Sequence, residues 1–320
     1  MITVFVDGQE GTTGLQIHER LARRNDIEML QIDPALRKDV SERARLLNAA
    51  DIAFLCLPDA AAKESAALVT NPHTVVIDAS TAHRVHPDWT YGLPELSAAQ
   101  RSKIAHAKKI ANPGCYATGF ILAAAPLVQA GVLPSSAQLV CHAVSGYSGA
   151  GKKLIALYEV EGAQVSHPGE SPKLFAPRAY AHALRHKHLP EMRQVSGLDR
   201  APIFTPIVGP YYKGMAVTIA LFPEQLTRSQ TPAQLADVLT KHYAGQTFVR
   251  VHPYEETPTL DGGFLDPTTC NDSNRAEVHI FGHAEQMEIT VVLDNLGKGA
   301  SGAAVQNMNI ALGLDESLGF

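Results

Sequence analysis

The chain of 320 residues is long enough for two domains, and its composition argues against several kinds of partner. It carries 27 basic and 32 acidic residues, a net charge of −5, so nothing favours nucleic acid or an anionic membrane surface. No apolar run reaches membrane-spanning length, and the N-terminus leads directly into a strand pattern. We therefore expect a soluble, cytoplasmic protein that acts on a small molecule.

The first third of the chain alternates strand-like and helix-compatible segments. The strand-like runs are ITVFV, IEMLQI, IAFLCL and TVVIDAS, and helix-compatible segments such as 15–24 and 59–69 lie between them. This alternation is typical of a Rossmann-type, doubly wound parallel sheet in the α/β class.

From about residue 138 the strand-like runs lie closer together and are separated by loops rich in proline and glycine. These runs are QLVCHAV, MAVTIALF, TFVRV, EVHIF and MEITVVLDN, and residues 166–180 read as a long loop. The pattern predicts a second, α+β domain with a mixed sheet.

A glycine-rich loop directly follows the first strand-like run. Gly8, Gly11 and Gly14 are spaced three apart in DGQEGTTG, and a helix pattern follows. Glycines allow a pyrophosphate to approach the backbone, and a helix N-terminus supplies N–H donors, so the loop predicts a dinucleotide site rather than an ordinary tight turn. Thr12 and Thr13, within the loop, are further candidate cofactor contacts.

The residues after the second strand-like run leave the choice of dinucleotide open. Asp33 closes the second strand, 19 residues after Gly14, where a carboxylate would hold the ribose hydroxyls of NAD. Arg37 and Lys38 follow, and they would instead pair with the 2′-phosphate of NADP.

A lone cysteine follows a Pro-Gly corner in the stretch NPGCYATGF. This corner lets the chain turn sharply and places Cys115 at the start of a helix, whose positive end favours a thiolate. The alternative is a small buried cysteine with no chemical role. The other cysteines are Cys56 and Cys141 in apolar runs, where burial would make them inert, and Cys270 in a polar loop, a weaker rival.

A nucleophilic thiol beside a nicotinamide site requires an acid–base partner. His188, with Glu191 three residues on to orient it, is the candidate in RHKHLPEM, and His186 is its rival. Arg84 is a candidate for holding a phosphate or carboxylate of the substrate, although a surface arginine is the common alternative. We expect no metal site, including at the group His182, His186 and His188.

Several stretches together resemble the N-acetyl-gamma-glutamyl-phosphate reductases, relatives of aspartate-semialdehyde dehydrogenase. They are GQEGTTG, YGLPEL, NPGCYAT, SGYSGAGKK, RHKHLPE and DNLGKGASGAAVQNMN, and the length matches the shorter variety of the family. Two departures are Thr12, where the longer variety has tyrosine, and Ala117, where many members have proline.

This resemblance implies a reaction and a set of site residues. Cys115 would attack the acyl phosphate of N-acetylglutamate, NADPH would reduce the thioester to the semialdehyde, and His188 would handle the protons. Further candidate cofactor-binding residues are Ser80 and, on the nicotinamide side, Ser148, Gly149 and Asn295. Relatives form homodimers or homotetramers. The alternatives are a reductase of another acyl phosphate, such as aspartate-semialdehyde dehydrogenase, a non-catalytic NADP(H) sensor, and a cysteine hydrolase.

The last part of the chain, KGASGAAVQNMNIALGL, predicts an apolar helix over 299–314 that must pack on another element. We expect it to return to the first domain. The NADP-binding domain would then comprise residues 1–114 completed by 299–320, and residues 115–298 would form a catalytic and oligomerisation domain.

Overall fold

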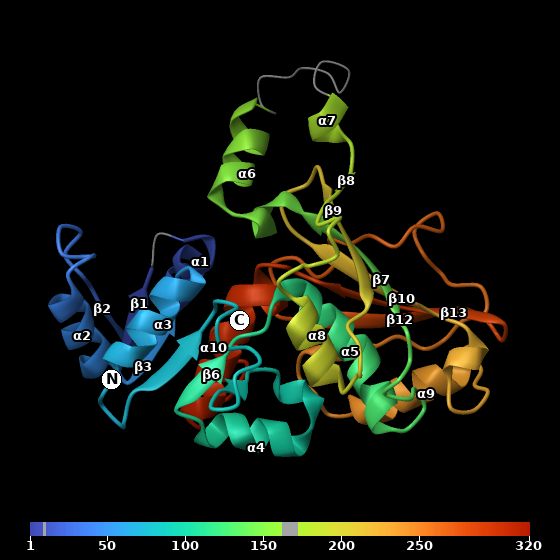
Figure 1. Ribbon diagram of the computed structural model, residues 1–320, viewed down its shortest axis with the longest axis horizontal. Coiled ribbons are helices and arrows are strands. Elements are labelled where there is room, and N and C mark those ends of the chain that lie inside the picture. The colour runs from blue at the N-terminus through green and yellow to red at the C-terminus, as the bar shows by residue number, and fades with distance from the viewer. Residues whose placement is uncertain (9–10, 162–171) are drawn as a thin grey trace. The chain divides into compact units, whose positions relative to one another are not determined.

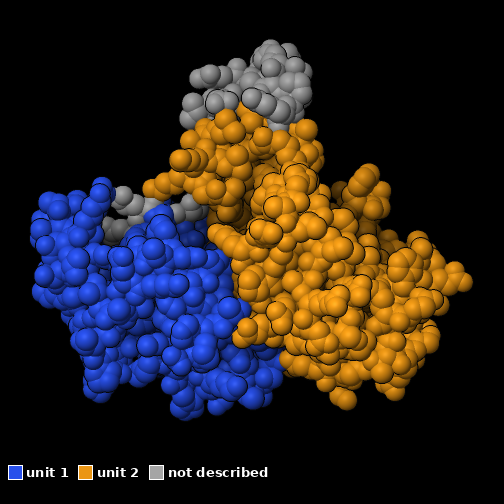
Figure 2. All heavy atoms as spheres, in the orientation of Figure 1, with its two compact units in different colours: residues 1–114, 300–320 blue, residues 115–299 orange. Residues whose placement is uncertain are grey.

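A computed structural model of the chain describes residues 1–8, 11–161 and 172–320 (Figure 1). The chain divides into two compact units, which are described separately. Unit 1 comprises Met1–Gly114 and Ala300–Phe320, and unit 2 comprises Cys115–Gly299 (Figure 2). None of the described helices combines the length and apolar character needed to span a bilayer.

Unit 1 contains a six-stranded parallel sheet, as the alternating pattern predicts. Its order is β2-β1-β3-β4-β6-β5, with every neighbouring pair parallel. The strands are β1 (Ile2–Asp7), β2 (Ile27–Leu30), β3 (Ile52–Leu55), β4 (Val75–Asp78), β5 (Thr90–Tyr91) and β6 (Lys109–Ala111). The strand order reverses between β1 and β3, and ligands of such sheets bind outside the carboxyl ends of the strands at this point.

Alternate residues of the strands feed two separate cores of unit 1. Val4 and Val6 pack in a core with α1 (Thr12–Leu21), α4 (Ala98–His106) and α10 (Gly302–Ala311), whereas Phe5 faces α2 (Val40–Ala49) and α3 (Asp59–Leu68). The two-residue period of a strand explains this division. Both faces of the sheet are therefore covered, as expected of a doubly wound fold.

Helix α10 is tied to the rest of unit 1 by buried amides. Asn307 Nδ2 donates to the carbonyl of Gly92 at 2.9 Å, and Gln306 Nε2 donates to a carboxylate oxygen of Glu95 at 2.9 Å. Two of the stretches that carry the family resemblance, YGLPEL and AVQNMN, thus bind each other. These hydrogen bonds explain the residue types at Glu95, Gln306 and Asn307.

Unit 2 contains a seven-stranded mixed sheet, which confirms the second part of the fold prediction. Its order is β11-β12-β13-β10-β7-β9-β8, in which β11/β12 and β7/β9 are parallel and the other pairs are antiparallel. The strands are β7 (Val140–Gly146), β8 (Arg178–Ala179), β9 (Ile203–Gly209), β10 (Met215–Leu221), β11 (Val249–Val251), β12 (Ala276–His283) and β13 (Gln286–Leu293).

Helix α5 (Cys115–Gln129) packs on the sheet at β10 and β13 and also contacts α8 (Leu189–Ser196) and α9 (Pro232–His242). Helix α9 packs on β11 and β12. Figure 1 shows α9 below strands β12 and β13. Two short helices, α6 (Lys152–Ala156) and α7 (Pro172–Phe175), lie in the connection between β7 and β8.

The structure corrects several predicted boundaries. Strand β2 ends at Leu30, so Asp33 lies beyond the strand rather than closing it. The predicted loop over 166–180 lies partly outside the described residues, and its described part contains α7 and β8. The terminal helix begins at Gly302, because residues Gly297–Ser301 form a wider π-helical turn.

Candidate active site

The glycine loop begins where β1 ends. Gly8 has φ +89°, and a Cβ there would lie 2.5 Å from the Cys56 carbonyl oxygen, so only glycine fits. Gly11 donates its N–H to the Gly8 carbonyl at 3.0 Å and precedes the first residue of α1. Gly14 is buried within α1 and Thr13 is half-buried, while the side chain of Thr12 and residues 9 and 10 lie outside the described residues. Gly8 and Gly11 therefore present backbone without side chains beside a helix N-terminus, which suits a pyrophosphate.

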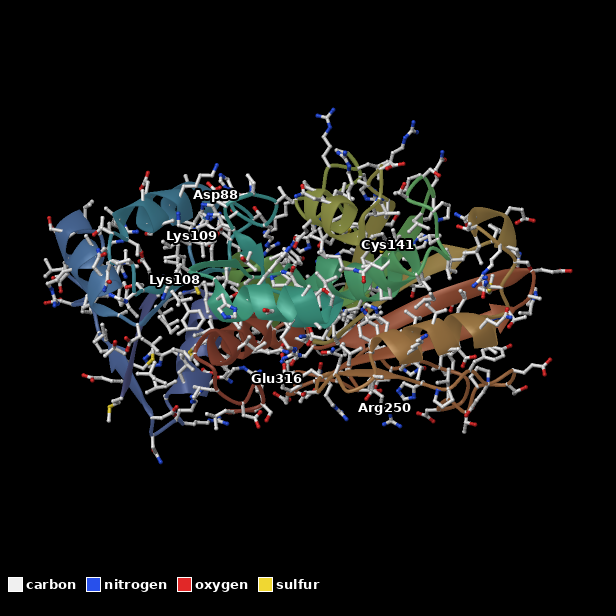
Figure 3. The ribbon with its side chains drawn as sticks, turned by 90° about the horizontal axis from the view of Figure 1, so that it is seen from below. Asp88, Lys108, Lys109, Cys141, Arg250 and Glu316 are labelled. Atoms are coloured by element: carbon white, nitrogen blue, oxygen red, sulfur yellow. The ribbon has the colours of Figure 1, made fainter. Side chains whose placement is uncertain are left out.

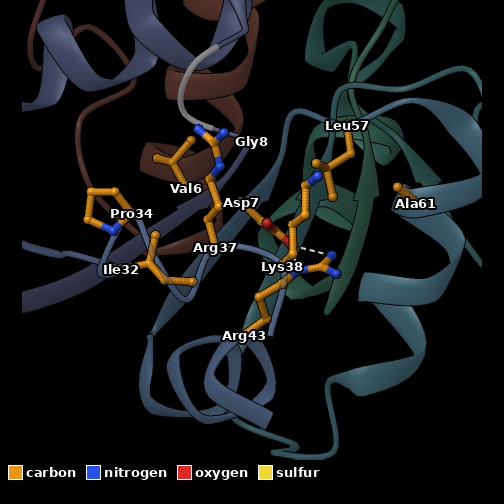
Figure 4. Close-up of a pocket in the computed structure, with 10 residues that line it drawn as sticks. All are labelled: Val6, Asp7, Gly8, Ile32, Pro34, Arg37, Lys38, Arg43, Leu57 and Ala61. Atoms are coloured by element: carbon orange, nitrogen blue, oxygen red, sulfur yellow. Dashed lines mark hydrogen bonds and ion pairs between the residues drawn. The ribbon is translucent and has the colours of Figure 1, made fainter. Parts of the chain in front are cut away.

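A pocket of about 350 Å³ adjoins this loop (Figure 4). Arg37 and Lys38 both line it, and in Figure 4 their side chains extend toward the end of the pocket at Gly8 and Leu57. Asp33 is not among the described lining residues, and its carboxylate accepts the Ala35 N–H at 2.8 Å. Two cations therefore face this pocket, and the carboxylate that would favour NAD is engaged in a local turn.

A buried ion pair, which sequence reasoning missed, lies in the wall of the same pocket. Arg43 Nη2 lies 2.8 Å from Asp7 Oδ2, and the Ser65 hydroxyl donates to the same oxygen at 2.6 Å (Figure 4). Asp7 ends β1 and is only 5% exposed. Nothing in the spacing of these three residues pointed to their meeting, because they come from β1, α2 and α3.

The end of β4 carries the other predicted residues of unit 1. The Ser80 hydroxyl donates to Asp78 Oδ2 at 2.7 Å, and His83 Nδ1 lies 2.6 Å from the same oxygen. Arg84 donates through Nε to the Asn112 carbonyl at 3.0 Å and through Nη2 to the Ala79 carbonyl at 3.1 Å. Part of the Arg84 guanidinium thus holds backbone at the carboxyl ends of β4 and β6.

Cys115 is the first residue of α5 and is half-buried. Gly299, the last residue of unit 2, packs directly against Cys115. A Cβ on Gly299 would be 2.7 Å from Cys115 Cβ. Gly299 is held there by its N–H, which donates to the Asp294 carbonyl at 2.9 Å. The thiol therefore belongs to the residue at the positive end of a 15-residue helix, with Gly299 packed against its Cβ.

The other three cysteines have thiol pKa values raised by burial. Burial raises the pKa of Cys56 to about 12 and that of Cys270 to about 11, and it raises the pKa of Cys141 still further. Cys270 was expected in a polar loop, but its side chain is buried. These thiols are protonated at neutral pH and are poor nucleophiles.

An aromatic and histidine cluster surrounds the residue next to the nucleophile. The ring of Tyr116 lies 5.8 Å from that of His186 and 6.0 Å from that of His188, and the two imidazoles are 4.7 Å apart. The Tyr180 hydroxyl donates to the Tyr116 hydroxyl at 3.2 Å. Burial raises the pKa of Tyr180 to about 12 and that of Tyr116 well above its usual value, so both stay protonated as donors.

The two candidate histidines have different surroundings. His188 is only 5% exposed and lies at the N-cap of α8, whereas His186 is half-buried and accepts the His188 N–H through Nδ1 at 3.2 Å. Glu191, in the first turn of α8, is 1% exposed. His182, the third histidine of the group, is exposed.

The predicted nicotinamide-side residues are held together by one buried amide. Asn295 Nδ2 donates to the Ser148 hydroxyl at 2.9 Å, and its Oδ1 accepts the Gly214 N–H at 2.8 Å. A Cβ on Gly149 would lie 3.2 Å from the same Nδ2. Asn295 therefore fixes the loop after β7, and its amide is already engaged with protein at both ends.

The structure thus gathers the predicted residues into two groups, one in each unit. Unit 1 holds Gly8, Gly11, Arg37, Lys38, Ser80 and Arg84, and unit 2 holds Cys115, His188, Glu191, Ser148, Gly149 and Asn295. Sequence reasoning missed Tyr116 and Tyr180 as members of the second group. Tyr116 directly follows the cysteine and could have been suspected from NPGCY, whereas Tyr180 is 64 positions further on.

A doubly wound sheet with a dinucleotide loop, followed by a unit with a cysteine at the start of a helix, defines a two-domain oxidoreductase of the nicotinamide type. Two family models match: "Semialdehyde dehydrogenase, NAD binding domain" over residues 3–105 and "Semialdehyde dehydrogenase, dimerisation domain" over residues 115–295. The chain belongs to the semialdehyde dehydrogenase family, and within it to the N-acetyl-gamma-glutamyl-phosphate reductases. Unit 1 is therefore a nicotinamide-dinucleotide-binding domain.

Relatives of this second, narrower group match over nearly the whole chain. The N-acetyl-gamma-glutamyl-phosphate reductase 2 of a Nostoc species is 46% identical and covers 99% of this chain and 98% of its own. The N-acetyl-gamma-glutamyl-phosphate reductase of Brucella ovis is 48% identical and covers 97% and 98%.

Solved structures of aspartate semialdehyde dehydrogenases share the fold. The Francisella tularensis structure has a TM-score of 0.73 at 14% identity and covers 97% of this chain and 99% of its own. That of Vibrio cholerae, complexed with ASA, has a TM-score of 0.70 at 16% identity and covers 98% of each chain.

Proposed function

We propose that the chain catalyses the NADPH-dependent reduction of N-acetyl-L-glutamyl 5-phosphate to N-acetyl-L-glutamate 5-semialdehyde and phosphate, a step of arginine biosynthesis. The observation that carries this proposal is Cys115 at the start of α5, half-buried beside a cluster that contains His188, while the other thiols are made inert by burial. The curated relatives at 46–48% identity bear the name of this activity.

The thiol of Cys115 would supply the covalent step. Its sulfur attacks the acyl carbon, the bond from that carbon to the phosphate oxygen breaks, and phosphate leaves with the electron pair, so that a thioester remains on Cys115. Bound NADPH supplies the hydride that reduces the acyl group. The resulting thiohemiacetal collapses to the aldehyde as the carbon–sulfur bond breaks and the thiolate returns.

His188 would serve as the acid–base group of this sequence. Collapse of the thiohemiacetal requires a base for its hydroxyl proton, and an imidazole exchanges protons near neutral pH. The ring of His188 lies beside Tyr116, the neighbour of the nucleophile, and Glu191 follows in the first turn of α8. Buried, protonated Tyr116 and Tyr180 provide hydroxyl donors in the same cluster.

NADP(H) is the dinucleotide that the pocket of unit 1 favours. Gly8 leaves space that a side chain would fill, and Arg37 and Lys38 face the pocket while Asp33 is turned to the backbone of Ala35. Two cations suit a 2′-phosphate, and a carboxylate at that place would repel it. Thr12, Thr13, Gly14 and Ser80 remain proposed cofactor contacts.

The preference for NADPH depends on Arg37 and Lys38 and is testable by removing both. We expect Arg37→Ala/Lys38→Ala to raise KM for NADPH about 10-fold or more, since a hydrogen bond to a charged group is worth roughly 1.5–3 kcal/mol. KM for NADH should change little, because NADH has no 2′-phosphate. The matched control, Arg23→Ala/Lys63→Ala, removes two exposed cations of unit 1 outside the pocket. Equal changes for NADPH and NADH would overturn the assignment.

The two units would divide the work between cofactor binding and catalysis. We assign NADP(H) binding to residues 1–114 with the returning C-terminal segment, and the thiol chemistry and oligomerisation to the rest.

Val140 and Ile203, paired in register on β7 and β9, are exposed at 37% and 54%, which suits a contact between copies in a homodimer or homotetramer. The substrate and cofactor are soluble metabolites, consistent with a cytoplasmic enzyme.

The substrate is tested most directly in the reverse direction, because acyl phosphates are labile. With N-acetylglutamate semialdehyde, inorganic phosphate and NADP⁺, we expect NADPH to appear, and omission of phosphate should stop it. Aspartate semialdehyde carries an ammonium group and lacks the acetamide, so kcat/KM should be lower by roughly 10³-fold or more. If it is the better substrate, the chain is an aspartate-semialdehyde dehydrogenase. Turnover that ignores phosphate would rule out transfer of the acyl group to phosphate and with it the proposed reductase reaction. Binding of NADP⁺ without turnover would indicate a sensor.

A further inference from the structure

Three side chains far from Cys115 in sequence form a compact set of metal-binding groups in unit 2. One ring nitrogen each from His252 and His279 and a carboxylate oxygen of Glu277 all lie within 4.8 Å of one another. His252 Nε2 is 3.0 Å from Glu277 Oε2, and the two imidazoles stack with centroids 4.1 Å apart.

The sheet register explains why these residues meet. Glu277 and His279 are two positions apart on β12, so their side chains share a face of the sheet. Strand β11 runs parallel to β12, and immediately after it the His252 N–H donates to the Val278 carbonyl at 2.9 Å. This bond sets His252 beside His279, and the arrangement therefore depends on backbone pairing as well as on side-chain contacts.

His279 lacks a polar partner that its burial would lead us to expect. The residue is 8% exposed, and its Nε2 is buried without a hydrogen-bond partner among the residues that the structure describes. A buried polar nitrogen without a partner destabilises the folded protein, because it has lost its hydrogen bond to water.

We propose that His252, Glu277 and His279 bind one divalent transition-metal ion of the zinc class, which joins the segment after β11 to β12. Two imidazoles and one carboxylate are a familiar zinc ligand set, and three protein ligands leave a position for water. Arg275 Nη1 lies 3.6 Å from Glu277 Oε1, so the second carboxylate oxygen is shared with a cation. Arg250, labelled in Figure 3, extends outward from the same edge and adds positive charge that weakens the site.

The proposal is tested by zinc binding to the untagged full-length chain, with a readout independent of catalysis. Because the Cys115 thiol also binds zinc, equilibrium dialysis with zinc chloride is done on Cys115→Ser as well as on the natural sequence. We expect one zinc ion per chain in Cys115→Ser. His252→Ala or His279→Ala in that background should weaken zinc binding by more than about 100-fold. Loss of a residue that only supports a metal ligand weakens binding by at most about 100-fold, so a larger loss indicates a ligand.

A matched control is His142→Ala, which removes an exposed histidine from β7 of the same sheet and should leave binding unchanged. Zinc should raise the Tm of the control but not that of His252→Ala. His252→Ala should disturb folding less than His279→Ala does, because the His252 side chain is 29% exposed. Absence of stoichiometric zinc, or equal binding by His252→Ala and the control, would overturn the proposal.

Discussion

Replacing Cys115 with serine is expected to lower the rate of acyl-phosphate reduction by about 10⁴-fold or more, because the serine hydroxyl is not ionised near neutral pH. Binding of NADPH should be nearly unchanged, since the glycine loop and the Arg37–Lys38 pocket belong to unit 1. Steady-state turnover and NADPH fluorescence titration on the same preparation measure the two effects separately.

Cys270→Ser is the matched control for that variant. The Cys270 thiol is buried and has a pKa raised to about 11, so its replacement should leave kcat nearly intact while lowering the Tm. Retained turnover in Cys115→Ser would remove the thiol from the mechanism. Loss of turnover in Cys270→Ser without loss of folded protein would mean that we have assigned the wrong cysteine.

His188→Ala is expected to lower kcat by roughly 10²–10⁴-fold, the usual contribution of a positioned acid–base group. The low-pH limb of the kcat profile should also disappear, because the titrating base is gone. His188 is 5% exposed and its ring lies 6.0 Å from that of Tyr116, beside the nucleophile. The measurement is kcat across pH 5–9, with circular dichroism to confirm that the variant folds.

His186→Ala is the comparison that decides between the two histidines. Its Nδ1 accepts the N–H of His188, so the variant should lose some positioning of His188 and show a smaller loss of kcat with the pH limb retained. Glu191→Gln should likewise lower kcat less than His188→Ala does. If His186→Ala abolishes the pH limb and His188→Ala keeps it, His186 is the base.

The sequence was most informative where local patterns decide the structure. Strand periodicity and the glycine loop are properties of neighbouring residues, and they correctly predicted the parallel sheet, the mixed sheet and the fold class. Element ends were less predictable: β2 stops at Leu30 and α10 starts at Gly302, because turn geometry and packing override propensity at the ends.

The site was only partly predictable, for a physical reason. Cys115 and Gly8 are marked by neighbours that bend the backbone, so they stand out in the sequence. Other contacts join segments that are distant in the sequence, such as Tyr180 with Tyr116 and Arg43 with Asp7. The spacing of residues along the chain does not predict such contacts. Asn295, predicted on the nicotinamide side, also holds Ser148 and Gly214 together through its amide, a role visible only in three dimensions.

The return of α10 to unit 1 has a consequence for how the chain is made. Val305 and Met308 belong to the same core as Val4 and Ile77, so that core lacks a helix until the last residues have been synthesised. Domains usually fold in order as they leave the ribosome. Here the core that the sheet shares with α1 and α4 stays partly uncovered while all of unit 2 is translated, because α10 follows unit 2 in the chain. Nascent chains stalled before residue 300 should therefore be bound by chaperones and cleaved by proteases, whereas the released protein should resist both.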